Sequence, residues 1–429
     1  MEVDFDVIVV GGGVAGSVCA LKLAQMGHEV ALVDRGETPG AKNLSGGVFY
    51  SAVMDEVIPD FTQRAPVERL IGRNELLFLT KTGHVGLTTS DTRLVADANA
   101  CSVLRAKLDR WLAEQAEEAG VAVVAGMLVD RILTEDGRVC GLAVGDDELR
   151  SHVVVAADGV NSFIARSLNM RSRQPNHSLA VGVKSVIELG EDTIRERFQL
   201  TEDSGAAYAM VGEATQGVAG GGFCYTNRSS VSIGVVLQLA SLLETSKSSI
   251  EIHDAFLAHP SVAPLIDGGE RVEYGCHMTI ESGASVDASL VGDGIVVVGD
   301  AAGLTLNVGY AIRGMDLAAA SALAAAGAIH DALDAGDVTR TGLSSYVTRL
   351  AASPAGADIA RFAPAATLFS ERSLYEDLPD VLGEAAYRLY RHDKAPHEPA
   401  RAIVADALRR SGVSIVDLAR MGWKGVSHL

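Results

Sequence analysis

The first 34 residues alternate between apolar runs and small residues in an order that predicts α/β structure. Residues 6–10 read Asp-Val-Ile-Val-Val, and such a run is typical of a strand buried on both faces. The glycine-rich stretch 11–16 interrupts it, and the Ala- and Leu-rich residues 17–26 predict a helix that ends at Gly27. A second apolar run, 29–33, ends on Asp34. The pattern therefore predicts a strand, a glycine turn, a helix, a second strand and a terminal acid.

Further apolar runs continue this pattern along the chain. Residues 104–119 carry apolar side chains at helical spacing and end at Gly120, which predicts a second helix. Residues 176–280 change to strand-like alternation with scattered glycines, and 340–429 have a helical pattern with turn signals at prolines. Shorter runs predict strands at 121–124, 139–144, 153–157 and 294–298, and an Ala-rich helix at 315–329.

The glycine turn after the first predicted strand fits the G-x-G-x-x-G pattern of a dinucleotide-binding unit. In such a unit Gly11 permits the tight turn, Gly13 lets a pyrophosphate approach the backbone, and Gly16 lets the helix pack against the strand. The helix N-terminus offers N–H groups to the phosphates. Asp34, 18 residues beyond Gly16, can accept hydrogen bonds from both ribose hydroxyls. The alternative is an ordinary packing turn between two strands and a helix.

A second strand-to-turn junction occurs far along the chain, where the last predicted strand leads into Gly299-Asp300. Asp300 can accept a hydrogen bond from a ribityl hydroxyl of a flavin whose ADP half is bound at the first turn. The alternative is that Asp300 is a simple helix N-cap. Arg313 and the N-terminus of the next helix would place positive potential near the flavin ring. Tyr310 either shields one flavin face or is a core tyrosine. The two turns together predict FAD.

Composition and charge narrow the classes of partner and compartment. The 429 residues include 36 Lys and Arg against 55 Asp and Glu, a formal net charge of −19, which argues against a nucleic-acid partner. Apolar runs stay shorter than about 18 residues, and no cationic segment precedes one near the N-terminus, so neither a transmembrane helix nor a secretory signal is expected. The five cysteines are scattered, which predicts buried thiols in a reducing cytosol and no disulfide, zinc or iron–sulfur site.

Several motifs together resemble one family. The chain is similar, over essentially its whole length, to the FixC-type branch of the electron-transfer-flavoprotein:quinone oxidoreductase family. The similarity is carried by the first glycine turn and by the stretches Pro39–Gly47, Ala157–Ser162, Gly220–Asn227, Gly299–Gly303, Arg313–Asp316 and Trp423–Gly425. The Lys42-Asn43 loop and the Gly220–Asn227 stretch are the specific parts, because many FAD enzymes share the others.

The resemblance implies bound FAD, electrons taken from a two-subunit electron-transfer flavoprotein, and delivery to a quinone. It also implies a cytoplasmic protein with peripheral contact at the inner face of the membrane. Single-chain members carry a ferredoxin-like segment with four clustered cysteines, which this sequence lacks, so a separate small ferredoxin-like protein is implied as a partner. By motif match the cofactor-binding residues are Gly11, Gly13, Val14, Ala15, Gly16, Asp34, Arg35, Lys42, Asn43, Gly46, Gly47, Arg105, Asp158, Gly299, Asp300, Gly309 and Tyr310.

The patterns and the resemblance predict an α/β fold. We expect a Rossmann-type FAD-binding domain like those of flavin hydroxylases and glutathione reductase, an inserted β-rich domain and a helical C-terminus. Residues 1–70, 91–175 and 281–340 would form the FAD-binding domain. Residues 71–90 and 176–280 would form the β-rich substrate or quinone domain, and 341–429 the helical region.

Other functions share this plan. A flavin monooxygenase of the hydroxylase type usually has His and Pro after the Gly-Asp turn, whereas residues 303–307 read Gly-Leu-Thr-Leu-Asn. A prenyl-chain reductase of the geranylgeranyl type would use the β-rich region as an apolar tunnel, and a FAD-bearing subunit would have no turnover of its own. The stretch 371–393 is either an amphipathic surface for a membrane or partner, or a packed helix pair. No metal site is expected, because His253, His259 and His277 lack ligand spacing.

Overall fold

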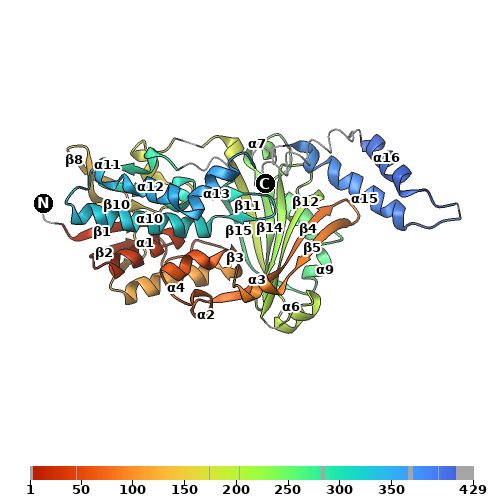
Figure 1. Cartoon of the computed structure of the whole chain (residues 1–429), viewed down its shortest axis with the longest axis horizontal. Helices are drawn as coiled ribbons and strands as arrows, with labels where there is room; N and C mark the ends of the chain where they lie inside the picture. The colour runs from red at the N-terminus through yellow and green to blue at the C-terminus, as the bar shows by residue number, and fades with distance from the viewer. Residues whose placement is uncertain are drawn as a thin grey trace.

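The computed structural model describes residues 3–44, 46–172, 174–201, 203–281, 286–365, 371–394 and 396–411. The motif at Trp423–Gly425 lies outside these ranges. Figure 1 shows an elongated molecule with a layered α/β part at one end, a large twisted sheet in the middle and two C-terminal helices at the other end.

The α/β part is built on a sheet whose central strands are parallel. The order across this sheet is β16-β17-β10-β1-β2-β7, and β9 and β8 continue from β10 as antiparallel strands. Because β1, β2, β7, β10 and β17 are parallel, their carboxyl ends meet at one edge, which is where the two predicted turns occur. The bounds are β1 Phe5–Val10, β2 Val30–Val33, β7 Ala122–Val124, β8 Arg131–Glu135, β9 Arg138–Val144, β10 Asp147–Ala156, β16 Val291–Gly292 and β17 Ile295–Val297.

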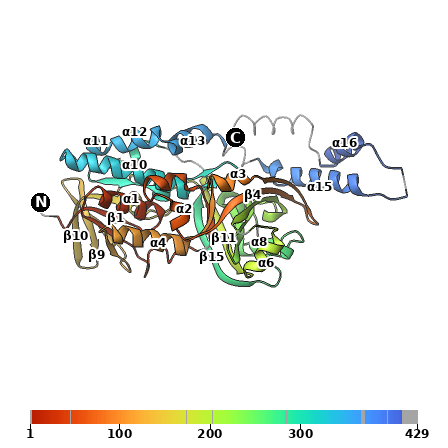
Figure 2. The ribbon, with the colours of Figure 1, turned by 60° about the horizontal axis from the view of Figure 1, so that its bottom comes forward.

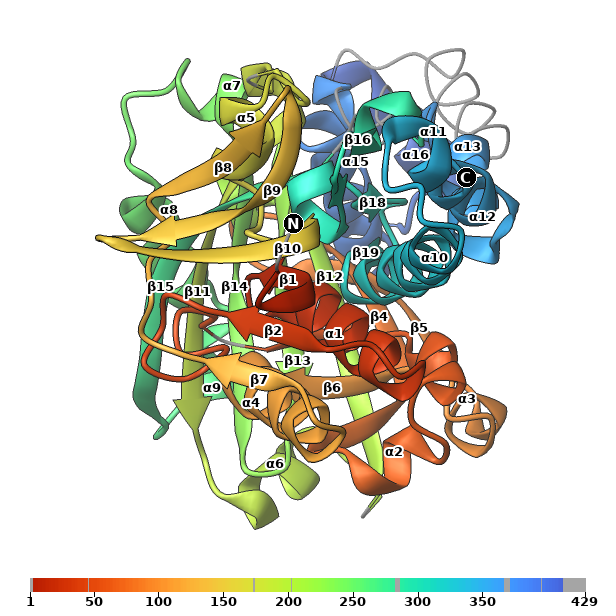
Figure 3. The same ribbon diagram turned by 90° about the vertical axis from the view of Figure 1, so that its left-hand side faces the viewer.

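Alternate residues of β1 enter two different cores. Val7 and Val9 pack with α1, α4 and α10, whereas Ile8 and Val10 pack with the β8–β9 hairpin and α5. These layers bury both faces of the sheet, which explains the uninterrupted apolar run in the sequence. Figure 3 shows this end of the molecule, with α1 and α10 on one side of β1 and the β8–β9 hairpin on the other. The helices are α1 Val14–Gln25, α4 Arg105–Glu118, α5 Phe163–Ser167 and α10 Met315–Asp334.

The β-rich part is a nine-stranded sheet in the order β15-β11-β14-β13-β12-β4-β6-β3, with β5 paired to β4. Its pairs are antiparallel except for the parallel pair of β12 and β4. The strands are β3 Gly46–Phe49, β4 Val67–Leu79, β5 His84–Ser90, β6 Cys101–Leu104, β11 Leu179–Glu188, β12 Ser204–Gly212, β13 Gly220–Thr226, β14 Ser230–Gln238 and β15 Glu270–Ile280. Strands β3 and β6 pair with this sheet although their residues were expected in the first domain. The domain boundaries stay a prediction.

Side chains alternate between two environments along this sheet. Tyr208 and Met210 on β12 point into a core that Phe256 of α8 (Ser249–Leu257) and residues of α6 (Glu191–Arg197) complete. Ala207 and Ala209 point to the opposite face. Helices thus cover one face of the sheet, and the other face lines the cavity described below.

The C-terminal helices form two groups. In the first group, α12 packs on α10, and the hydroxyl of Tyr346 donates to the carbonyl oxygen of Val297 at 2.9 Å. In the second group, α15 and α16 pack against each other through Val381 and Ile403 and project from the body, as Figure 2 shows. The amphipathic stretch therefore includes one helix of a packed pair, with Tyr390 exposed on it. The helices are α11 Arg340–Leu343, α12 Ser345–Ala352, α13 Pro354–Phe362, α15 Asp377–Tyr390 and α16 Ala400–Ser411.

Short elements connect these layers. They are α2 Phe61–Arg64, α3 Thr92–Ala96, α7 Leu239–Leu242, α9 Ala263–Ile266, β18 Leu306–Asn307, β19 Ile312–Arg313, and the single 3-10 turns η1 Ser51–Glu56, η2 Asn176–Ser178, η3 Glu213–Thr215, η4 Ala288–Leu290, η5 Gly299–Ala302 and η6 Arg372–Leu374. Among the described residues, no helix has the length and apolar character needed to cross a membrane. The predicted α/β class, with a Rossmann-type part, a β-rich part and a helical C-terminus, is confirmed.

The cysteines follow the sequence prediction with one exception. Four of the five are buried, and burial raises the thiol pKa of Cys19, Cys101 and Cys224 to about 12. Cys276 is exposed, so the prediction of a buried thiol is wrong there. It lies on β15, which is the first strand in the order of the described sheet.

Candidate functional site

The glycine turn after β1 is packed too tightly for a side chain at two positions. Gly11 has a φ of +107°, and a Cβ there would lie 2.3 Å from the carbonyl oxygen of Ala157. A Cβ on Gly16 would lie 1.9 Å from the carbonyl oxygen of Gly11. The turn therefore brings the start of α1, with its buried residues Val14 and Ala15, against the ends of β1 and β10.

Asp34, which follows β2, is fixed by two backbone donors. The N–H of Gly12 donates to its Oδ2 and the N–H of Gly36 donates to its Oδ1, both at 2.7 Å. Each carboxylate oxygen keeps a lone pair for a further donor such as a ribose hydroxyl. The neighbouring Arg35 is exposed and makes no hydrogen bond or ion pair with the rest of the described chain.

Gly13 faces hydrogen-bond donors instead of a packed wall. A Cβ at Gly13 would lie 3.5 Å from Nη2 of Arg105 and 3.9 Å from Nδ2 of Asn43. The buried carboxylate of Asp109 holds both side chains, Arg105 through Nη2 at 2.8 Å and Asn43 through Nδ2 at 2.5 Å. The cradle at Gly13 is thus bordered by a guanidinium, an amide and the N-terminus of α1. This is the donor set that binds an anion such as a pyrophosphate.

The Lys42-Asn43 loop contributes only one of its two residues to this cradle. Lys42 is exposed and, like Arg35, makes no hydrogen bond or ion pair among the residues that the structure describes. The structure therefore brings Asn43 to Gly13, whereas no hydrogen bond or ion pair links Lys42 or Arg35 to the other predicted residues in the described chain.

Close contacts at three more glycines hold further elements at this edge. A Cβ on Gly46 would lie 2.2 Å from the carbonyl oxygen of Val103, and one on Gly47 would lie 3.2 Å from Cε of Met315. A Cβ on Gly299, whose φ is +59°, would lie 2.8 Å from Cβ of Ala15. Strand β3 therefore lies against β6 and the start of α10, and η5 lies against α1.

Two carboxyl groups follow the strand ends at this edge. Asp158 follows β10, and its Oδ2 accepts the N–H of Ile164 at 3.1 Å, so it stabilises the first turn of α5. Asp300 lies in η5, where burial raises its carboxyl pKa while the charges of Arg105, Arg171 and Lys184 oppose that rise. Asp300 thus lies among cations at the junction of the two sheets.

Two of these cations were not identified from the sequence. Arg171 donates through Nη1 to the carbonyl oxygens of Asp300 at 2.9 Å and Ala301 at 2.6 Å. Lys184 extends from β11 of the second sheet, and burial together with the charge of Arg105 lowers its pKa to about 8. No described residue forms an ion pair or hydrogen bond with its ammonium group. The available signal was a lone charge inside the apolar run of residues 179–187.

The segment after the second turn forms a β18–β19 hairpin. The N–H of Gly309 donates to Oδ1 of Asn307 at 2.9 Å, and Gly309 has a φ of +78°, which closes the turn. Tyr310 is 63% exposed, so its interpretation as a core tyrosine is wrong. Whether Tyr310 shields a flavin face stays a prediction.

Arg313 on β19 does not carry free positive charge. Its Nε donates to Oδ2 of Asp316 at 2.6 Å, and its Nη1 donates to Oδ2 of Asp358. Two carboxylates therefore neutralise the guanidinium. The expectation that Arg313 places positive potential near the flavin is wrong.

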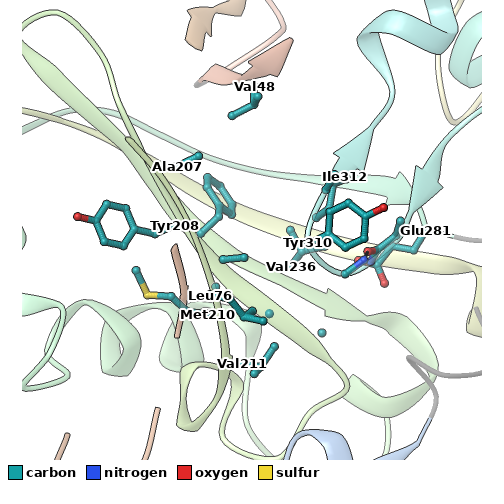
Figure 4. Close-up of a pocket in the computed structure, with 18 of the residues that line it drawn as sticks. Val48, Leu76, Ala207, Tyr208, Met210, Val211, Val236, Glu281, Tyr310 and Ile312 are labelled. Carbon is teal, nitrogen blue, oxygen red and sulfur yellow. Dashed lines mark hydrogen bonds between the residues drawn. The ribbon is translucent and has the colours of Figure 1, made fainter. Parts of the chain in front are cut away.

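A cavity of about 620 Å³ lies between the hairpin and the second sheet. Its walls are the face of the sheet that carries Ala207 and Ala209, the glycines of β13, and the Gly309-Tyr310 turn. Figure 4 shows Tyr310, Ile312 and Glu281 on one side of it, and Leu76, Val211 and Val236 toward the sheet.

The residues at the carboxyl ends of the parallel strands have the chemistry needed to bind FAD. Arg105 and Asn43 offer donors at a glycine that leaves room for a phosphate, and Asp34 offers acceptors for ribose hydroxyls. Asp300 offers a carboxyl group that lies near the charges of Arg105, Arg171 and Lys184, where the two sheets meet. The unpaired Lys184 adds a positive charge that an anionic cofactor would neutralise.

Comparison with known proteins identifies the family. The model of FAD dependent oxidoreductases matches residues 6–98. The chain is 39% identical over 426 residues to the probable electron transfer flavoprotein-quinone oxidoreductase YdiS of Escherichia coli strain K12, covering 99% of both chains. It is 39% identical over 429 residues, again covering 99% of both, to the protein FixC of Salmonella typhi.

Solved structures with the same fold include other flavin enzymes. A geranylgeranyl bacteriochlorophyll reductase-like protein from Thermoplasma acidophilum aligns with a TM-score of 0.70 at 17% identity, over 97% of this chain and 99% of that one. The FAD-dependent halogenase CndH aligns with a TM-score of 0.65 at 19% identity, over 96% and 97%. At this identity the likeness concerns the fold alone. The full-length identity to the curated relatives shows that the chain belongs to the FAD-dependent FixC and electron transfer flavoprotein-quinone oxidoreductase family and is an electron-transfer oxidoreductase.

Proposed function

We propose that this chain takes electrons from an electron-transfer flavoprotein at its FAD and passes them to a quinone bound in the 620 Å³ cavity. The observation that carries the proposal is the position of this cavity on the second sheet. Val236 lines the cavity and pairs in register with Gly182 of β11. Lys184, two residues further along, shares that sheet face. The cavity and the Lys184–Asp300 edge are therefore neighbours on one surface.

The lining of the cavity suits a quinone. Apolar side chains such as Leu76, Val211 and Val236 offer contact to an apolar ring and tail. The described lining contains no Lys or Arg that would bind the phosphates of a nicotinamide cofactor. We therefore assign an uncharged redox partner to the cavity.

In this proposal the FAD supplies the redox chemistry, and the residues of the chain position it. Asp34 would hold the ribose, Arg105 and Asn43 the pyrophosphate, and Asp300 the ribityl chain. Gly46 and Gly47 would allow the close approach of β3, and Asp158 would keep α5 in place. The cavity walls would exclude water from the acceptor and orient its ring.

Three exposed apolar side chains support peripheral contact with a membrane. Leu87 (67% exposed), Tyr310 (63%) and Ile312 (49%) line the cavity and are open to solvent, so they lie at its mouth. A quinone with a long apolar tail could enter there from a lipid surface. We further propose, from the family resemblance, that a small ferredoxin-like protein supplies an iron–sulfur cluster between the donor and this chain.

Anaerobic stopped-flow reduction tests the proposal. A reduced electron-transfer flavoprotein, supplied with the ferredoxin-like partner, should reduce the FAD quickly, and a soluble quinone should then reoxidise it quickly. NADH and NADPH alone should reduce it slowly. Rapid NADPH oxidation stimulated by a prenyl or aromatic substrate would overturn the proposal in favour of an alkene reductase or a hydroxylase.

A further inference from the structure

Among the described residues that line the cavity, one carboxyl group has no cation paired with it. Two acidic residues line it, Glu75 and Glu281. Glu75 is paired with Arg73, with Nε and Oε1 3.1 Å apart. In the described part of the chain no residue forms an ion pair or hydrogen bond with the side chain of Glu281. The two carboxyl groups thus line one cavity, but only that of Glu75 is paired with a cation among the described residues.

The backbone places Glu281 firmly at the cavity wall. Glu281 follows the last residue of β15, and its N–H donates to the carbonyl oxygen of Ser178 at 3.0 Å. Figure 4 shows its side chain at the same side of the cavity as Tyr310. Burial raises the pKa of this carboxyl to about 7, because loss of solvent disfavours its charged form. Glu281 therefore holds its proton to a higher pH than an ordinary glutamate.

Other ionisable groups line the cavity, and three tyrosines among them hold their protons to a higher pH than Glu281 does. Burial raises the pKa of Tyr50, Tyr225 and Tyr375 above the ordinary value of 10.0, and the hydroxyl of Tyr375 is also engaged with the backbone of Gly220. His177 is exposed to solvent. The other ionisable residues that line the cavity are Tyr50, Glu75, His177, Tyr208, Tyr225, Tyr310 and Tyr375, of which Tyr208 packs its ring into the core against Phe198. The charge of Glu281 contributes to the raised pKa of Tyr375.

A quinone must take up protons as well as electrons when it is reduced. Two electrons and two protons convert both carbonyl oxygens to hydroxyl groups. The electrons come from the two-electron-reduced flavin, whose oxidation releases at least one proton. The second proton must come from another donor, and a carboxyl group on the cavity wall is positioned to supply it.

We propose that Glu281 is the proton donor to the quinone. This inference rests on the proposed function. The carboxyl O–H bond breaks as the quinone oxygen gains its proton and the electron pair arrives from the reduced flavin. The resulting carboxylate then takes a proton from solvent at the cavity mouth. We do not assign this role to Glu75, because its Oε1 is paired with Nε of Arg73 at 3.1 Å.

The test measures flavin reoxidation in the FAD-loaded full chain. The chain is reduced anaerobically and mixed with a short-chain benzoquinone between pH 5.5 and 8.5, and separately with ferricenium, which accepts an electron and no proton. Positioned general acids contribute roughly 10²-fold or more to proton transfer. The ratio of the quinone rate to the ferricenium rate should therefore fall about 10²-fold in Glu281→Gln at pH 6.5. The wild-type quinone rate should fall as pH rises past about 7, and this limb should vanish in Glu281→Gln.

Two further variants make the outcome specific. Glu281→Asp should restore part of the rate ratio and the pH limb, and Glu75→Gln should keep the wild-type pH limb. FAD content and melting temperature verify that each variant is folded. Equal rate ratios and pH profiles in wild type and Glu281→Gln would overturn this inference alone. A wild-type chain that ferricenium reoxidises but no quinone does would overturn the proposed function as well.

Discussion

Replacing Lys184 by methionine should stabilise the cofactor-free chain and weaken its hold on FAD. The Lys184 ammonium is partly buried at the junction of the two sheets, and no described residue pairs with it. Its charge therefore opposes folding until an anionic group binds nearby. Methionine has a similar length and no charge, so Lys184→Met removes the opposing charge while filling the same space.

The size of the effect follows from the pKa of Lys184. Burial lowers this pKa from 10.5 to about 8. At about 1.4 kcal/mol per pKa unit, the charged form costs the folded chain about 3 kcal/mol at pH 7. Between pH 8 and 10.5 the lysine is protonated in the unfolded chain and neutral in the folded chain. The free-energy cost of the charge to the folded state therefore declines as pH rises through this window. The stabilising effect of Lys184→Met should decline with it.

Thermal unfolding of the cofactor-free chain measures this effect. The Lys184→Met chain should melt at a higher temperature than wild type at pH 7, and the gap should shrink by pH 9.5. Because a charge-assisted hydrogen bond contributes about 1.5–3 kcal/mol, FAD affinity should fall by roughly 10- to 100-fold, as measured by quenching of flavin fluorescence. The exposed Lys81 provides the control, since Lys81→Met should change neither quantity. A Lys184→Met chain that melts lower without FAD, or binds FAD equally well, would refute the reasoning.

Three further outcomes test the site. Asp34→Ala should lose FAD on gel filtration, because the two ribose hydrogen bonds are charge-assisted, and unchanged flavin absorbance per chain would contradict the assignment. Gly16→Ala should fail to yield folded flavoprotein, because its Cβ would lie 1.9 Å from a carbonyl oxygen, whereas Gly83→Ala, with nothing within 4 Å, should fold and retain FAD. The purified chain should contain no iron–sulfur cluster, and iron and sulfide near four per chain would disprove this.

The turns of the α/β part could be predicted because their chemistry is local. Gly11, Gly16 and Asp34 lie within one strand–helix–strand unit, where spacing alone determines what they contact. Gly299 and Asp300 follow a strand of the same sheet, so parallel pairing brings them to the same edge. The class of fold and the family follow from such units.

The contacts between distant elements could not be predicted in this way. Lys184 approaches Asp300 only because β11 of the second sheet lies beside η5, and no local spacing encodes that approach. Arg313 gave a wrong prediction because Asp358, 45 residues away on α13, neutralises it. Glu281 appeared as one acid among many in the sequence, and only the fold shows that it lines the cavity.

The alternation along the second sheet connects these observations. The same strands bury Tyr208 and Met210 against α8 and expose Ala207 and Ala209 to the cavity, so one backbone forms both a core and a binding surface. The small residues on the cavity side leave room for an occupant, because a larger side chain at Ala207 or Ala209 would fill it. Two ionisable side chains lie at different places along this face. Lys184 lies near Asp300, and Glu281 lies at the wall of the cavity. In the function we propose, this division would let charge and proton be controlled separately along one surface between the FAD and its electron acceptor.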